Sequence, residues 1–190
     1  MQLALFQIVY IEDFQKFIDF WSALYSYPQE EEYECLIQKK TFVEADLICL
    51  FTWKNGMKLS TKKRQTLQEK ILCKLSLIQQ FKGEGFDIED FKIAFGSLSA
   101  VWQLFLLHCI NPVEYPMYDQ HIHRAFCKIH KQAYHHITDR ISEKSKLAFY
   151  YKEYLGFVKE HKEFDLRKID KALFTYGRFL KTNLATKGYV

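Results

Sequence analysis

Residues 115–126 of this chain read YPMYDQHIHRAF. A proline and an aspartate stand directly before a segment that begins polar and then becomes apolar, which is the pattern of a helix start. At that start Asp119 takes the N-cap position, because a carboxylate can accept hydrogen bonds from the free amides of the first turn. Those bonds and the positive end of the helix both favour the charged carboxylate. We therefore expect an ionised Asp119 at the beginning of a helix, either as a simple cap or with a further role.

Apolar side chains recur at helical spacing along most of the chain. The expected helices cover 12–26, 62–81, 98–110, 120–135, 142–161 and 165–182. Residues 40–53 are apolar on several sides and fit either a buried helix or a strand. Hydrophobic residues make up 48% of the chain, with only three prolines and seven glycines, which favours a helical globular protein over a sandwich with many turns. The sequence predicts an all-α fold.

The segment before residue 115 adds a second pattern. It reads FGSLSAVW over 95–102, continues as an apolar run over 104–110, and ends in Asn111-Pro112. This order, followed by Asp-x-His-Ile-x-Arg, resembles the helix-hairpin-helix DNA glycosylases, the superfamily that includes endonuclease III and the 8-oxoguanine glycosylases. The resemblance covers about residues 95–126.

The resemblance implies an all-α, two-lobed helical bundle. Residues 1–190 would form a single compact domain in which a lobe of about 35–115 ends in the hairpin, at 88–110. The second lobe would combine about 1–30 with 116–190.

The resemblance also implies a function: base excision from double-stranded DNA that carries a damaged or modified base. The N-glycosidic bond of the flipped base would be hydrolysed, and Asp119 would stabilise the positive charge that develops on the sugar and orient or deprotonate the attacking water. Backbone amides of the hairpin, around Gly96, Ser97 and Ser99, would bind a DNA phosphate. His121 would contact a backbone phosphate near the flipped nucleotide.

The hairpin departs from the family pattern at two points. Gly96 stands for one of two usual glycines, and the position of the lysine found in bifunctional members falls on Ser99 or Ala100. Without that amine in the hairpin, the expected enzyme is monofunctional and releases the base through water; the alternative is that Lys54 supplies an amine from outside the hairpin. Arg124 is expected to contact either DNA or an intramolecular partner, and Lys54 is a further candidate for a phosphate contact. The alternative is a catalytically inactive DNA-binding relative or a helical interaction module.

A flipped nucleotide needs an aromatic or apolar pocket. The candidates for its walls are Trp53, Trp102 and Tyr118, together with Tyr115. For each of these side chains the alternative is a place in the hydrophobic core.

Positive charge is concentrated in two segments, although the whole chain is nearly balanced at 27 basic and 23 acidic side chains. One segment covers residues 54–74 and the other covers residues 124–152. They fit either one positive face that attracts phosphates or a solvated lysine-rich surface.

Several other classes are disfavoured by the sequence. The histidines of His121-x-His123 diverge by about 200° on a helix, and no convincing metal-ligand set accompanies them. No phosphate-binding or dinucleotide-binding glycine motif is present, so no nucleotide cofactor, and no cofactor of any kind, is expected. No apolar run reaches the roughly 18 residues of a membrane span. The five cysteines lack a C-x-x-C pair and are expected to be reduced and mostly buried, as in a cytoplasmic protein, nucleoid-associated if bacterial.

Overall fold

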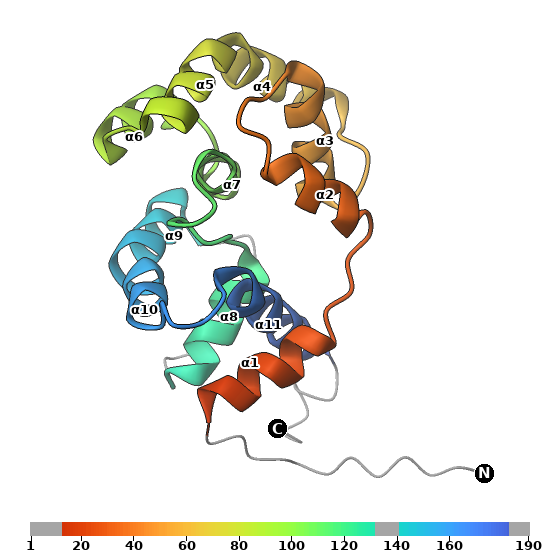
Figure 1. Ribbon diagram of the computed structural model, residues 1–190, viewed down its shortest axis with the longest axis vertical. Coiled ribbons are helices and arrows are strands. Elements are labelled where there is room, and N and C mark those ends of the chain that lie inside the picture. Colours follow the sequence, from red (N-terminus) through yellow and green to blue (C-terminus); the bar gives the residue numbers. More distant parts are fainter. Residues whose placement is uncertain (1–12, 132–140, 183–190) are drawn as a thin grey trace, which may run out of the picture. The chain divides into compact units, whose positions relative to one another are not determined.

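The structure is a computed structural model that describes residues 13–131 and 141–182. Its elements are α1 (Phe14–Ala23), α2 (Glu30–Ile37), α3 (Glu44–Asn55), α4 (Thr61–Lys70), the 3-10 turn η1 (Leu72–Lys74), α5 (Leu75–Glu84), α6 (Ile88–Phe95), α7 (Ala100–Ile110), α8 (Gln120–Ile129), α9 (Glu143–Phe149), the π-helical turn η2 (Tyr150–Tyr154), α10 (Leu155–Glu160) and α11 (Leu166–Phe179) (Figure 1). Within the described ranges every regular element is a helix, which confirms the all-α prediction.

The chain divides into two compact units. The Asp119 unit comprises residues 1–25, 119–141 and 157–190, and the hairpin unit comprises residues 26–118 and 142–156. We expected 142–156 in the lobe formed by 116–190, whereas this segment groups with the hairpin. Tyr150 provides one reason, because its hydroxyl donates to the Pro116 carbonyl at 2.9 Å, and the Tyr118 ring lies against Phe149 and Tyr150.

Helix α7 is the centre of the hairpin unit (Figure 1). All of its residues except Val101 are buried, because the helix is apolar around its whole circumference. Its one buried histidine, His108, donates from Nδ1 to the Tyr115 carbonyl at 2.7 Å. Nε2 is then the acceptor for the Tyr33 hydroxyl at 2.6 Å, so both ring nitrogens are satisfied.

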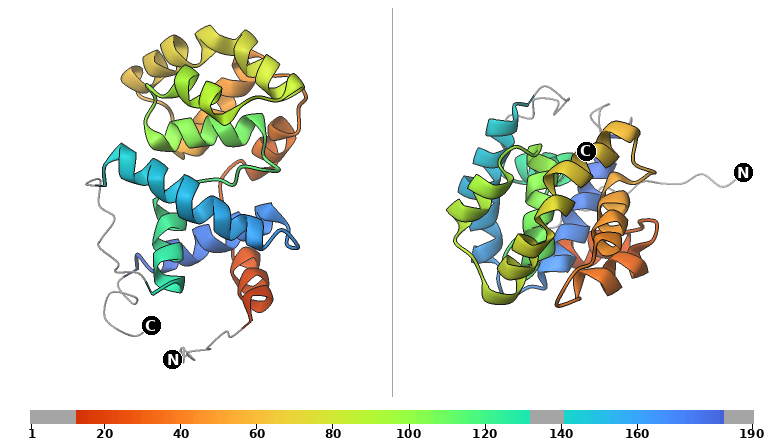
Figure 2. Two further views of the ribbon diagram at one scale, coloured as in Figure 1. Left: turned by 90° about the vertical axis from the view of Figure 1, so that its left-hand side faces the viewer. Right: turned by 90° about the horizontal axis from the view of Figure 1, so that it is seen from above.

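Helices α1, α8 and α11 form the core of the Asp119 unit (Figure 2). The closest approach is between α8 and α11, where a Cβ atom added to Gly177 would lie 1.9 Å from the His121 carbonyl oxygen. The Arg124 guanidinium donates to the Gly177 carbonyl at 2.9 Å, and the Arg124 side chain is only 3% exposed. The lack of a side chain at Gly177 thus sets how near α11 lies to the first turn of α8.

The structure corrects, resolves or adds to the predicted helices at four places. The basic helix expected at 62–81 ends at Lys70, because the backbone turns at Ile71 (φ −121°) and places Ile71 and Leu72 in the core. The ambiguous 40–53 segment is helix α3, which ends at left-handed Gly56. Helix α2 was not predicted; its first turn holds three glutamates, which suit the positive helix end. The helix expected at 142–161 is interrupted by the π turn η2.

Parts of other predictions fall outside the described residues. These are residue 12 of the helix expected at 12–26, residues 132–135 of the helix expected at 120–135, and Arg140 of the second basic segment.

Two further predictions concerned the burial of the cysteines and the presence of membrane-spanning helices. All five thiols are free, but only Cys109 and Cys127 are buried, so the expectation of mostly buried cysteines is wrong. Among the described residues, no helix has both the length and the apolar character that a bilayer span requires.

The close contact between Gly177 and the His121 backbone allows the packing of α11 against α8 to be tested by mutation. Gly177→Ala should lower the free energy of unfolding by about 1–3 kcal/mol, because the added methyl group meets the His121 backbone and overpacks the interface. Gly83→Ala in α5 is the matched control: nothing lies within 4 Å of a Cβ atom added there, and a gain of about 0.5–1 kcal/mol is expected from its better helix propensity. Urea unfolding measures both. A Gly177→Ala protein as stable as wild type would contradict the packing described here.

Candidate functional site

Asp119 occupies the N-cap of α8, as predicted. Its Oδ1 atom accepts from the amides of His121 at 2.7 Å and Ile122 at 3.0 Å, while its own backbone is extended. The carboxylate therefore uses the positive end of a helix of ten residues. Asp119 is half-buried, so its position combines a fixed orientation with access to solvent. The cap is confirmed, and a catalytic role stays a prediction.

His121 lies next to this carboxylate and packs toward α11. Its Nδ1 atom accepts from the Arg124 guanidinium at 2.9 Å, and its ring meets Phe174 edge-on. Burial lowers the pKa of His121 against the opposing attraction of Asp119, and the charge of Arg124 lowers the pKa further. The imidazole is thus held neutral, with its proton on Nε2. A neutral ring has one N–H donor and no charge, and a hydrogen bond with the Gly177 backbone already engages the ring, so little is left for a phosphate.

Arg124 is held inside the Asp119 unit. Its NH1 atom donates both to His121 and to the Gly177 carbonyl, and the side chain is buried. The intramolecular role considered for it is therefore observed. A guanidinium in this place supports α8 and has little surface to present to a nucleic acid.

The hairpin is a short turn between α6 and α7. Gly96, Ser97 and Ser99 are exposed, whereas Leu98 is buried and its amide donates to the Phe95 carbonyl at 3.1 Å. Gly96 has φ −62°, a value that any residue adopts, but a Cβ atom added there would lie 2.6 Å from the Lys92 carbonyl oxygen, so this close approach favours glycine. The predicted order of turn, apolar helix, Pro-containing loop and Asp119 helix is present along the chain.

A carboxylate already occupies the start of α7. Glu143 accepts a hydrogen bond from the Ala100 amide, and its other oxygen accepts from Lys146 at 2.6 Å. Burial raises the pKa of Glu143, but the hydrogen bonds from Lys146 and Ala100 outweigh it and the pKa is lowered. Sequence reasoning missed Glu143, because a contact between residues 43 positions apart leaves no local signal.

Two lysine side chains form hydrogen bonds with backbone carbonyls at the hairpin. Lys70, at the end of α4, donates to the Ser97 carbonyl at 2.9 Å, and Lys74 in η1 donates to the Ala94 carbonyl. Both come from the first basic segment, 54–74. The sequence predicted a positive segment but not its position against the hairpin.

The candidates for a base pocket belong to the hairpin unit. Trp53, Trp102 and Tyr118 are buried, whereas Tyr115 is half-buried and lies beside the Phe86 ring. Trp102 lies against Phe51, and Tyr118 lies against Phe149 and Tyr150. The Trp53 indole stacks on Tyr33, with centroids 4.0 Å apart. These contacts are those of core side chains, the alternative weighed for each of them.

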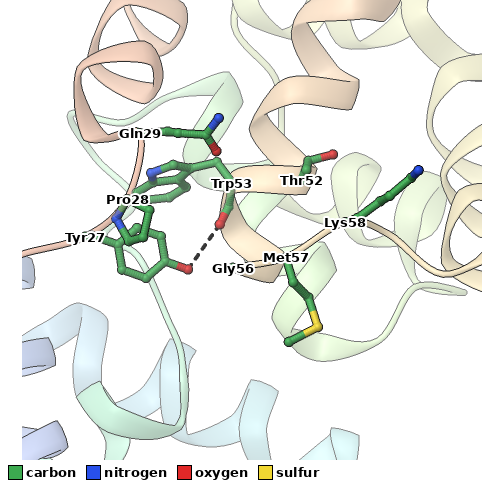
Figure 3. A pocket seen from close by; sticks show the side chains of 8 residues that line it. All are labelled: Tyr27, Pro28, Gln29, Thr52, Trp53, Gly56, Met57 and Lys58. Carbon is green, nitrogen blue, oxygen red and sulfur yellow. Dashed lines mark hydrogen bonds between the residues drawn. The ribbon is translucent and has the colours of Figure 1, made fainter.

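Trp53 also lines a pocket, which Figure 3 shows from close by. The lining residues are Tyr27, Pro28, Gln29, Thr52, Trp53, Gly56, Met57 and Lys58, and the volume is about 100 Å³. A cavity of about 150 Å³ holds benzene, so this pocket is too small to enclose a nucleobase. The neighbouring Lys54 lies with its ammonium 5.7 Å from the Phe105 ring centroid.

Neither a metal site nor a known relative adds to this description. In residues 13–131 and 141–182, no three His, Cys, Asp or Glu side chains are grouped to hold a metal ion. Comparison with protein-family models, curated proteins and solved structures found no match.

The capping role of Asp119 can be measured separately from any chemistry. Asp119→Ala should lower the free energy of unfolding by about 0.5–2 kcal/mol, whereas Asp119→Asn should stay within a few tenths of wild type, because asparagine caps as well as aspartate. Urea unfolding at neutral pH measures both variants. Equal stability of Asp119→Ala and wild type would show that the two amide bonds contribute nothing.

The lowered pKa of His121 predicts a pH dependence. The unfolded chain binds a proton near the ordinary value of 6.5, above the value in the folded protein, so the unfolded state holds more protons as the pH falls below 6.5. Stability is therefore complete above that pH and declines on acidification. His121→Gln should lose less stability than wild type between pH 7.5 and pH 5.5 in chemical denaturation. Identical losses in the two proteins would contradict the lowered pKa.

Proposed function

We propose that this protein is a monofunctional DNA glycosylase that hydrolyses the N-glycosidic bond of a damaged or modified base flipped out of duplex DNA. The observation that carries the proposal is the Asp119 carboxylate, fixed by two amides at the start of α8 and still half-exposed. The order of elements before it, from the α6–α7 hairpin to the Pro-containing loop, supports the same interpretation.

The chemistry follows from a fixed negative charge. Cleavage of the bond between base and sugar builds positive charge on the sugar, in an oxocarbenium-like transition state. A carboxylate that is already oriented stabilises this charge without reorganising during the reaction. The same oxygen atoms can orient a water molecule or accept its proton.

The absence of a lysine within the hairpin sequence favours base release through water. Ser99 and Ala100 stand where bifunctional relatives carry lysine, and the nearby Lys70 and Lys74 ammonium groups donate to backbone carbonyls. A protonated ammonium is no nucleophile, so Schiff-base formation is not supported at this place. The expected product is an abasic site in an intact strand.

One observation favours a second candidate, a DNA-binding relative without catalysis. The Glu143 carboxylate at the Ala100 amide places negative charge where the family resemblance implies a DNA phosphate. A protein that kept the helices and lost this phosphate contact would bind DNA in an altered way and release no base.

The test is base release from duplexes that each carry one oxidised, deaminated, alkylated or mismatched base. Wild type should release one class of base, and Asp119→Asn should reduce the rate by about 100-fold or more while binding DNA within about twofold of wild type. Strand breakage should appear only after alkali.

The matched control for this test is Asp165→Asn. Asp165 caps α11 with the same geometry, since its carboxylate accepts from the amides of Arg167 at 2.7 Å and Lys168 at 3.2 Å. This variant should keep the wild-type rate. Base release that survives Asp119→Asn, or release that Asp165→Asn abolishes equally, would contradict the assignment of Asp119.

A further inference from the structure

We propose that Lys70 and Lys74 form the site that binds a DNA backbone phosphate at the hairpin, in place of the amide at the start of α7. The proposal rests on the proposed function in one respect, namely that duplex DNA is the ligand. It assigns the contact to side chains of α4 and η1, which no pattern in the hairpin sequence singles out.

The hairpin backbone alone is a poor site for an anion. The last turn of α6 ends there, and the carbonyl groups at the end of a helix carry partial negative charge. On the other side, the first amide of α7 is already bound to the Glu143 carboxylate. A phosphate at this place would meet negative charge from both helices unless cations are present.

Lys70 and Lys74 supply those cations. Their ammonium groups lie on carbonyl oxygens only three residues apart in sequence, those of Ser97 and Ala94. Lys74 also lies over the Phe95 ring, with its nitrogen 5.3 Å from the ring centroid. Two positive charges are thus held against one short stretch of backbone.

Both charges remain uncompensated. In the part of the chain that the structure describes, neither ammonium forms an ion pair with a carboxylate. Each has three N–H donors, and the hydrogen bond to a carbonyl uses one of them. Both side chains are half-buried, so the charge and the remaining donors are partly accessible to an anion.

The surroundings are open to a large anionic ligand. Gly96, Ser97 and Ser99 are exposed, and the exposed Lys62, Lys63 and Arg64 extend the positive charge along α4. These three side chains diverge around α4, so they raise the positive potential near the lysine pair without forming one row, and a duplex with repeated charges gains more from this potential than a single phosphate ion does. Contacts of this kind bind the backbone without reading the sequence.

The experiment measures binding of a fluorescent duplex by anisotropy over a range of salt concentrations. Lys70→Gln and Lys74→Gln should each weaken binding and reduce the slope of log affinity against log salt by about 1, and the double variant by about 2. Lys70→Arg with Lys74→Arg should keep the slope, because the charge is kept. Lys40→Gln, an exposed lysine of the same unit, is the matched control and should behave as wild type.

A second variant covers the case in which the glutamine variants do not fold. Ser97 is exposed, and the contact with Lys70 uses its backbone carbonyl rather than its side chain. Ser97→Glu should therefore fold and should weaken duplex binding by repelling the phosphate. Inorganic phosphate is the competing probe: displacement of the duplex at low millimolar phosphate would assign the site to the free ion and overturn the proposal.

The outcomes separate this inference from the proposed function. Duplex binding with an unchanged salt slope in the double glutamine variant, or undiminished binding in Ser97→Glu, would overturn the lysine site and leave base excision standing. A wild-type protein that binds no duplex would overturn both.

Discussion

The contact between α8 and α11 at Gly177 is the constraint on which the candidate site depends. Because Gly177 has no side chain, α11 can lie against the His121 carbonyl, and Arg124 can reach across to the Gly177 carbonyl. Both interactions act on the first turn of α8, where the amides that hold Asp119 are located. A carboxylate can act on a developing charge only if its position is fixed beforehand. The glycine therefore influences the position of the Asp119 carboxylate.

At the hairpin, positive charge is supplied by lysine side chains, and a backbone amide is already bound by a carboxylate. The carboxylate of Glu143 satisfies an amide at the start of α7, which stabilises that helix and removes a donor that an anion would use. Lys70 and Lys74 satisfy carbonyls at the other side of the turn, which stabilises the end of α6 and brings positive charge to the same surface. Each pairing is a capping interaction in its own right. Together they shift the positive potential from backbone amides to lysine side chains.

Local features of the sequence were sufficient to predict the starts of α8 and α11. Asp119 and Asp165 lie at their caps, because capping depends on a side chain and amides only two or three residues away. The apolar run over 104–110 likewise predicted a helix at 98–110, and the structure shows that this helix, α7, is buried on nearly all sides. The break at Ile71 was not predictable in this way, because the apolar pattern continues through it and only tertiary packing places Ile71 and Leu72 in the core.

The contents of the site were harder to predict than the helices. An aromatic side chain has the same sequence signal in a core and in a pocket, and Trp53, Trp102 and Tyr118 are buried core residues. The partners of Arg124, Glu143 and Lys70 are 53, 43 and 27 residues away, so no periodicity or motif could identify them. The family resemblance pointed to Asp119 and the hairpin, whereas the structure alone revealed Glu143 and the two lysines.

The central claim is that Asp119 stabilises positive charge on a deoxyribose, and transition-state mimicry tests it most directly. Duplexes would carry either a cationic pyrrolidine or an uncharged tetrahydrofuran at an abasic position, and their affinities for wild type and Asp119→Asn would be compared. We predict that wild type binds the cationic duplex at least about 100-fold more tightly than the neutral one, as transition-state analogues do, and that Asp119→Asn loses this preference. Equal affinity of wild type for the two duplexes would contradict the account.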